Sequence, residues 1–324
     1  MRRAATLSFL AAVLGGCATL QAVRSGDFER AARGDLSAVG NVAKAVGTDA
    51  KPIVDLLQEL TPENEYYVGR TVAVRVLDNF EYRYRTQDYP AGLARGELRA
   101  ASLTEYLNQI GLVLADAALE RADRKGDRPA PLAGFHVVVV ESEQPNAFAA
   151  PGGFIFVTTG TLKAARTEDE LACVLAHEVA HVVRGHALGS VQRSRWANVP
   201  AEWLKSSKDL TPEQRGALQK MFEGTIGDIL DALLVKGYSR DTEYEADALG
   251  AKIAQAAGYD PNGLVSFLAT VKSRGEGGAG GAKASHGSPA ERIARLRTLP
   301  VLASGKNAGG ARAQRFGQMA KTLP

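Results

Sequence analysis

The chain has 324 residues, of which 45% are hydrophobic and 23% are charged, and its formal net charge is +3. This balance is typical of a globular protein with enough apolar residues to bury a sizeable core. The charge is too small to indicate a nucleic-acid surface, and the sequence has no basic run with interleaved aromatic residues. We therefore expect no nucleic-acid partner.

Residues 1–16 are expected to be a signal peptide, because two arginines precede an apolar run over 4–14 that is too short to span a bilayer. The stretch LGGC, which ends at Cys17, resembles the lipobox of bacterial lipoproteins, in which the cut falls before a cysteine that is then lipidated. A plain signal peptide with a chance cysteine is the alternative. Ala18 follows the cysteine, and the sorting rule for such lipoproteins then favours the outer membrane. We expect an outer-membrane lipoprotein that faces the periplasm of a Gram-negative bacterium and is held by a lipid anchor at Cys17.

Residues 17–60 are polar and rich in alanine, and we expect a tether with short helices because glycines interrupt the pattern. The segment 93–125 is predicted to hold a long amphipathic helix, because apolar residues recur at helical spacing. They are Leu103, Tyr106, Leu107, Ile110, Val113 and Leu114. The period then changes, and residues 135–142 and 153–162 are predicted to form strands.

The stretch LACVLAHEVAHVVRGH comes next, in a predicted helix that begins after Thr167. Thr167 and Glu170 fit a capping box, and Gly185 is a natural C-terminal stop. Helical patterns continue over 187–238, 238–258, 261–273 and 289–298. We expect an α+β fold, mostly helical with a small sheet, over residues 61–300, and a flexible basic tail over residues 301–324.

The segment HEVAH places His177 and His181 four residues apart, so they lie about 40° apart on one face of a helix. Two imidazoles at that spacing can bind one metal ion. Glu178 lies beside them and can reach a water at that ion, which makes it the candidate general base. This is the HExxH arrangement of zinc peptidases.

His186 is nine residues from His177, which on one continuous helix is about 180° around the axis. A metzincin pattern would need glycine at position 184 and histidine at position 187, where this sequence has Arg184 and Ala187. We therefore expect His186 to be a residue at the helix end, with no part in binding the metal.

A catalytic zinc takes three protein ligands, and the third is expected in SRDTEYEADALGAKIAQAAG. Two carboxylate pairs compete there. Glu243 and Asp247 share the apolar face of the predicted helix, whereas Asp241 and Glu245 share the face beside Lys252. A buried pair of carboxylates needs a positive partner. We therefore predict that Glu243 is the third ligand and that Asp247 orients a ligand histidine.

HEVAH followed by SRDTEYEAD resembles the HtpX and CAAX-prenyl-protease family of zinc metallopeptidases, which are gluzincins. The resemblance covers about residues 61–300 and includes PNAFAAPGGFIFVTTGTL, DELACVLAHEVAHV and the later SH…ERIARL. It implies a gluzincin-type domain in which the first glutamate of an ExxAD motif, here Glu243, binds zinc. Two features depart from the family: its membrane-spanning helices are missing, which suggests a soluble, lipid-anchored branch, and Gly287 stands where proline is frequent.

Residues outside these motifs are further candidates. Asn146 and Ala147 begin an edge segment that could pair with an extended peptide, and gluzincins use an Asn-Ala edge in this way. The alternative is a hairpin connection without a substrate role. His286 follows a Gly-rich loop and could cover the zinc, stabilise an oxyanion, or be an ordinary loop histidine. Arg292 matches a late arginine of the family and could pair with a carboxylate near the site.

These features predict an endopeptidase with one Zn²⁺ per chain that acts on unfolded or misassembled proteins of the periplasm or outer membrane, in envelope quality control. The substrate is inferred only from location and family. An alternative is a chaperone or assembly factor for outer-membrane proteins whose protease site is latent or self-inhibited by the His286 loop. A structural zinc site is disfavoured, because it would need no base such as Glu178.

Overall fold

The computed structural model describes residues 61–78, 83–84, 103–121, 123–190, 211–275, 286–305, 310–321 and 323. The predicted signal peptide, tether and Cys17 lie outside these ranges. The chain divides into two units, the larger made of residues 61–190 and 226–324. The other comprises residues 1–60 and 191–225, of which the described part, 211–225, belongs mainly to helix α13 (Pro212–Asp231).

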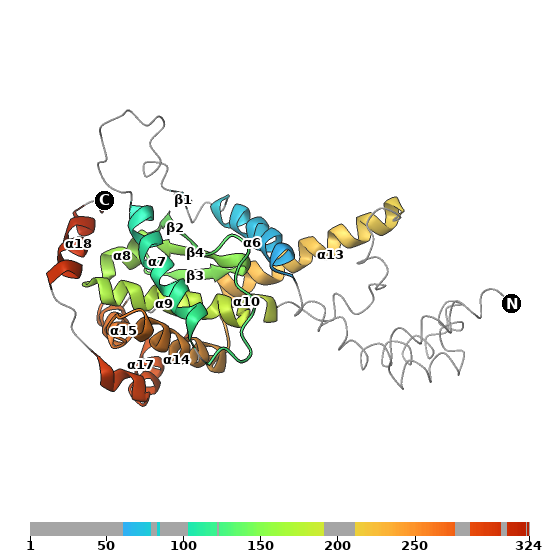
Figure 1. Ribbon diagram of the computed structural model, residues 1–324. Coiled ribbons are helices and arrows are strands. Elements are labelled where there is room, and N and C mark those ends of the chain that lie inside the picture. The colour runs from blue at the N-terminus through green and yellow to red at the C-terminus, as the bar shows by residue number, and fades with distance from the viewer. Residues whose placement is uncertain are drawn as a thin grey trace. The chain divides into compact units, whose positions relative to one another are not determined.

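Within the described residues, the larger unit contains a four-stranded mixed sheet with the strand order β1-β2-β4-β3 (Figure 1). The strands are β1 (Arg83–Tyr84), β2 (His136–Glu141), β3 (Ala147–Ala150) and β4 (Phe154–Thr158). Strands β2 and β4 run parallel, and β3 pairs antiparallel with β4 at one end of the sheet. The strand predicted over residues 135–142 is confirmed as β2. The strand predicted over residues 153–162 is confirmed only as far as Thr158, because the helix α8 (Thr159–Ala164) begins at the next residue, with the Thr158 side chain as its N-cap.

Helices make up most of the remaining described structure, so the predicted α+β fold with a small sheet is confirmed. They are α6 (Pro62–Leu77), α7 (Leu103–Glu120), η2 (Pro151–Gly153), α8 (Thr159–Ala164), α9 (Glu168–Arg184), α10 (His186–Gly189), η3 (Ala232–Lys236), α14 (Arg240–Ala256), α15 (Gly263–Ser273), α17 (Pro289–Leu296), η4 (Pro300–Ser304) and α18 (Gly310–Ala320). None of the helices in the described part of the chain is both long and apolar enough to cross a bilayer.

Helix α9 is the central element of the larger unit. It contacts β3 and helices α7, α14 and α15, and in Figure 1 it lies between the sheet and the pair α14 and α15. Every residue from Leu171 to Val183 is buried, which is expected of a helix surrounded by other elements on all sides. The HEVAH residues therefore lie inside the fold, where groups around them control their orientation.

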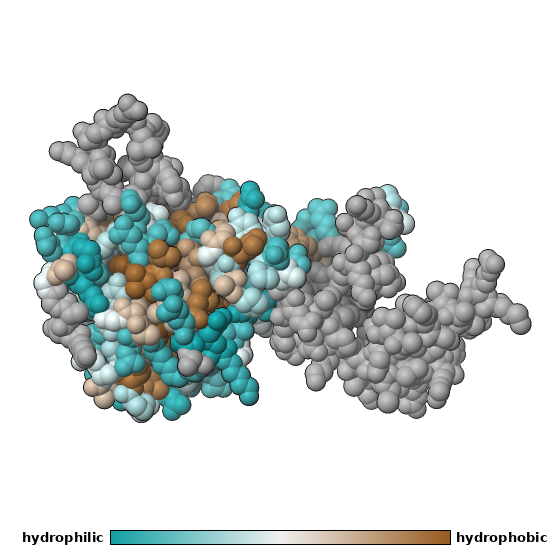
Figure 2. All heavy atoms as spheres, viewed as in Figure 1, coloured by the Kyte–Doolittle hydropathy of each residue, from teal (hydrophilic) through white to brown (hydrophobic). Residues whose placement is uncertain are grey.

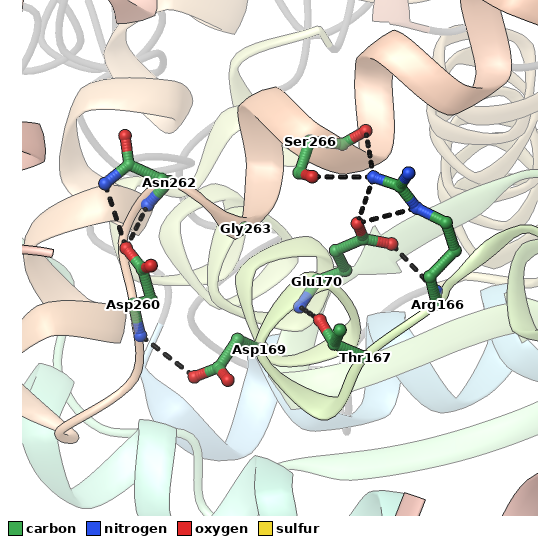
Figure 3. Close-up of a pocket in the computed structure, with 8 residues that line it drawn as sticks. All are labelled: Arg166, Thr167, Asp169, Glu170, Asp260, Asn262, Gly263 and Ser266. Carbon is green, nitrogen blue, oxygen red and sulfur yellow. Dashed lines mark hydrogen bonds and ion pairs between the residues drawn. The ribbon is translucent and has the colours of Figure 1, made fainter. Parts of the chain in front are cut away.

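Both ends of α9 are fixed by its sequence. The Thr167 hydroxyl accepts a hydrogen bond from the backbone N–H of Glu170 at 3.1 Å, as predicted. The Glu170 carboxylate reaches back to the backbone N–H of Arg166 at 2.8 Å and also binds the Arg166 side chain (Figure 3). At the other end, Gly185 adopts the left-handed conformation, with φ of 66°, and terminates the helix.

Helix α7 buries most of the apolar positions predicted for it, but Val113 was wrongly placed. Val113 is 47% exposed and its neighbour Leu112 is 71% exposed. Figure 2 shows apolar residues on the face of the molecule where α7 lies in Figure 1. Helical spacing predicted a wider buried face for α7 than the neighbouring elements cover, and Val113 lies outside the covered part.

The prediction of a flexible tail over residues 301–324 is also corrected. The chain is helical over η4 and α18, and Phe316 and Met319 of α18 are buried. Arg315 forms an ion pair with the buried Glu168 at 2.6 Å, and Arg312 pairs with Asp169 at 2.8 Å. These arginines were among the basic residues that suggested a solvated tail. They instead pair with acids at the start of α9 that are far away in the sequence.

Candidate metal centre and active site

Two helices bring the predicted metal ligands together. The Nε2 atoms of His177 and His181 lie 3.0 Å apart. The Glu243 carboxylate lies 3.4 Å from His177 Nε2 and 3.6 Å from His181 Nε2. A tetrahedral zinc with ligand bonds of about 2.1 Å places its ligand atoms about 3.4 Å apart. The three side chains are therefore spaced to within a few tenths of an ångström of what one zinc ion requires.

Helix α14 reaches this position because glycine lets it approach α9 closely. A Cβ atom added at Gly250 would lie 2.9 Å from both the Cα and the N of His177, closer than such atoms approach in proteins. Glu243 and Asp247 lie on the same face as Gly250 and are each 1% exposed, whereas Asp241 and Glu245 are exposed. The face predicted to be buried is confirmed.

Asp247 and Arg292 support this centre from behind. Asp247 Oδ1 lies 3.0 Å from His177 Nδ1, the geometry expected of a carboxylate that orients a ligand histidine. Arg292 donates to both oxygens of Asp247, at 2.6 and 3.0 Å, and lies 3.5 Å from Glu243. Burial raises the pKa of Asp247, but the Arg292 charge and the bond from His177 outweigh it and lower that pKa below its usual value.

The charges of the site suit a divalent cation. Three buried carboxylates, those of Glu178, Glu243 and Asp247, face one buried guanidinium, that of Arg292. With neutral histidines, three negative charges and one positive charge leave a net charge of −2. Burying uncompensated charge is costly, and a single divalent ion removes the imbalance. The donor set of two imidazoles and a carboxylate is one that zinc prefers.

Glu178 has the environment of a proton carrier. It is 2% exposed, and its Oε2 has no hydrogen-bond partner among the described residues. Burial raises the pKa of this carboxyl, and the nearby His286 and His177 act in the opposite direction without cancelling the increase. A buried carboxylate oxygen that accepts no hydrogen bond destabilises the ionised form of the side chain. The protonated form of Glu178 is therefore favoured more than in water.

The structure brings His286 into the same cluster, where it is 6% exposed. Its Nδ1 lies 3.2 Å from Glu243 Oε2, and its Nε2 lies 2.7 Å from the carbonyl oxygen of Ala147. One ligand atom from each of His177, His181, Glu243 and His286 falls within 4.8 Å of the others. His286 is therefore a site residue and not a solvated loop histidine.

Ala147 is the first residue of β3, the strand at one end of the sheet, and Asn146 directly precedes it. The Asn146 carbonyl accepts from the backbone N–H of Thr158, so the next carbonyl, that of Ala147, faces away from β4. His286 binds that carbonyl. Beside it is a cavity of about 40 Å³, lined by Pro145, Asn146, Ala147, Thr161, Val174, His177, Glu178, Leu264, Phe267, Leu268, His286 and Arg292.

His186 is not among the four converging ligands, but its predicted position was wrong. Its Nδ1 lies 2.9 Å from Nδ1 of His181. The prediction continued the helix past Gly185, whereas the left-handed glycine ends α9 and starts α10 at His186. Gly185 was correctly predicted to end the helix. The rotation of 100° per residue therefore could not be used to place His186, which follows it.

Tyr238 is a site residue that the sequence did not reveal. Its ring stacks on the His181 ring, with centroids 4.6 Å apart and an angle of 20°. Its hydroxyl is buried without a hydrogen-bond partner in the described part of the chain. Burial, and then the charges of Glu178 and Glu243, raise the pKa of this hydroxyl. Tyr238 precedes the helix that carries Glu243, and no spacing rule identifies it.

Comparison with known proteins agrees with this geometry. The model of Peptidase family M48 matches residues 104–299, which includes every residue of the cluster. The chain belongs to peptidase family M48. The match confirms the metallopeptidase resemblance that HEVAH and SRDTEYEAD predicted, and the M48 domain includes both motifs.

Three relatives show how far the similarity extends. The beta-barrel assembly-enhancing protease of Yersinia pestis is 30% identical over 169 residues, which are 51% of this chain and 32% of that protein. The mitochondrial metalloendopeptidase OMA1 of Schizosaccharomyces pombe is 33% identical over 49% of this chain and 44% of its own length. The metalloprotease YcaL of Escherichia coli is 31% identical over 50% and 59%. The M48 chain thus spans about a third of the first relative and about half of the other two.

Proposed function

We propose that this chain is a zinc-dependent endopeptidase with one zinc per chain, held by His177, His181 and Glu243. The observation that carries this proposal is the convergence of these three ligands beside the buried carboxylate of Glu178. Zinc in such a site supplies Lewis-acid polarisation of a peptide carbonyl and makes water more acidic.

The chain's own residues supply the proton transfer. Glu178 accepts a proton at Oε2 from the water that attacks the carbonyl and returns it to the leaving amine nitrogen. Its raised pKa suits both steps, because the carboxyl must hold the proton between them. Asp247 and Arg292 keep His177 oriented throughout.

The direct test is metal analysis of the mature protein together with cleavage of casein. We expect one equivalent of zinc, loss of cleavage when a chelator removes it, and recovery when zinc is added back. Cleavage that persists at full rate in the metal-free protein would show that the proposed centre is not the active site.

We propose unfolded or misassembled proteins of the periplasm or outer membrane as substrates, with attachment through a lipid at Cys17. Two observations support this location: the signal and lipobox pattern before Cys17, and relatives whose names refer to beta-barrel assembly. Fractionation of the cell envelope tests it. The protein should sediment with outer membranes, and Cys17→Ser should release it; a Cys17→Ser protein that stays on the membrane contradicts the anchor.

We propose that the edge of β3 holds the substrate backbone at Asn146 and Ala147, since β3 ends the sheet and the Ala147 carbonyl faces away from it. Asn146→Ala should raise KM for a peptide about 5- to 30-fold with little change in kcat, which corresponds to one or two lost hydrogen bonds. Gln144→Ala, at an exposed position two residues earlier, is the matched control. An unchanged KM would favour a plain connecting segment.

The contacts of His286 favour a second candidate, an assembly factor or chaperone whose protease site is latent. His286 binds the backbone oxygen of Ala147 that a substrate strand would need, and it also lies at Glu243. On this hypothesis the unmodified protein cleaves casein slowly, and zinc-dependent cleavage of unfolded protein separates the two candidates.

The variant His286→Ala should therefore increase kcat/KM about 5- to 30-fold, because a substrate no longer has to displace the bonds of His286. The control is His136→Ala, which removes an exposed histidine at the start of β2. A fall in kcat/KM for His286→Ala would instead show that this residue assists the reaction.

A further inference from the structure

The outer side of the metal centre contains an interaction that the proposed mechanism does not use. His181 directs Nε2 toward His177 and Glu243, and its other ring nitrogen lies 2.9 Å from Nδ1 of His186. The two rings meet edge to face with centroids 4.8 Å apart. The His186 side chain is only 10% exposed, so water has little access to this pair.

One proton fits between the two Nδ1 atoms, and metal binding at His181 determines which of the two nitrogens carries it. A neutral histidine that binds a metal through Nε2 carries its proton on Nδ1. His181 then donates to His186, whose own proton must be on Nε2. That atom faces Glu245 Oε2 at 3.6 Å, and Glu245 is held in turn by Arg184 at 3.0 Å. The charged residues at the surface therefore favour the same tautomers as the metal.

The two ligand histidines are supported by different chemistry. His177 has the carboxylate of Asp247 at its Nδ1, whereas His181 has the neutral ring of His186. A second carboxylate behind His181 would add a fourth buried negative charge to a centre that one divalent ion and Arg292 already balance. An imidazole accepts the same hydrogen bond without adding charge.

We propose that His186 is a positioning residue that fixes His181 in its zinc-binding tautomer and orientation, and so strengthens zinc binding. The inference rests on the proposed function, because it requires zinc at His181. Groups that hold a ligand histidine from outside typically contribute 10- to 100-fold in metal affinity.

The test is the zinc dissociation constant of the full chain, measured by competition with a chromophoric chelator. His186→Leu removes the acceptor and should weaken zinc binding 10- to 100-fold. His186→Asn places an amide oxygen near the position of Nδ1 and should recover at least half of that loss on a logarithmic scale. His136→Asn removes an exposed histidine and should leave the dissociation constant unchanged. Thermal unfolding of the metal-free variants reports whether each one folds.

A measurement on the unmodified protein keeps the test decisive if His186→Leu does not fold. In histidine labelled with ¹⁵N, His181 of the zinc-loaded protein should show a proton on Nδ1 that is protected from exchange with water. An unprotected proton, or zinc affinity unchanged in His186→Leu, overturns the inference alone. Equal loss in His186→Leu and His186→Asn also overturns it, because packing would then explain the effect. If the unmodified protein binds no zinc, the proposed function fails as well.

Discussion

The variant Glu178→Gln is expected to lower kcat/KM about 10²- to 10⁴-fold while the protein still binds one equivalent of zinc. Glutamine keeps the shape of the side chain but cannot accept a proton, so water activation and protonation of the leaving amine are both impaired. Glu178 is not among the converging ligand atoms, so zinc should remain bound. Measurement of kcat/KM on one peptide, together with zinc content, separates the two properties.

The control for this variant is Glu143→Gln, which removes an acid whose side chain is 83% exposed. It should change neither activity nor zinc content. Substantial proteolysis by Glu178→Gln would show that another group acts as the base. Loss of zinc in that variant would show that Glu178 contributes to binding, and the mechanism would need a different base.

The variant Arg292→Met is expected to lower the free energy of unfolding of the metal-free protein by about 3–5 kcal/mol. Arg292 is the guanidinium that faces the three buried carboxylates of the centre, and it is 5% exposed. Methionine has a similar length but no charge, so the buried Asp247 would lose both hydrogen bonds from the guanidinium and keep only its contact with His177. Denaturation by urea in the presence of chelator measures the change.

Two comparisons give this result its meaning. Arg295→Met changes an exposed arginine of the same helix, α17, and should cost less than 1 kcal/mol. The double variant Arg292→Met with Asp247→Leu should recover part of the loss, because no unpaired carboxylate is left behind. A change below 1 kcal/mol for Arg292→Met would mean that Asp247 is neutralised by another group.

The sequence predicted the inner part of the centre because that part depends on helical periodicity. Spacing of four residues placed His177 beside His181, and the apolar face of the second helix distinguished Glu243 from Glu245. Both arguments involve positions within one uninterrupted helix. The structure confirms the burial and convergence of these side chains.

Features that depend on contacts between remote segments were not predictable in the same way. The position of His186 changes at a single left-handed glycine, and Tyr238 meets His181 only through the fold. The helix α18 is fixed by acids almost 150 residues earlier in the chain, including Glu168 at a separation of 147 residues. Local composition has no information about such partners, so the tail was predicted to be flexible.

The missing side chain at Gly250 has a consequence for the precision of the centre. The ligand atoms of the histidines on α9 and of the glutamate on α14 must be positioned relative to one another to within tenths of an ångström. Changes of side-chain rotamer and sliding of the helices both work against this precision. At Gly250 the two helices touch through backbone atoms, so the distance between the two ligand sources has a hard lower limit. Gly250 therefore fixes how closely α14 can approach α9. The distance that the Glu243 side chain must span to reach the histidines is then independent of the rotamers of the surrounding side chains.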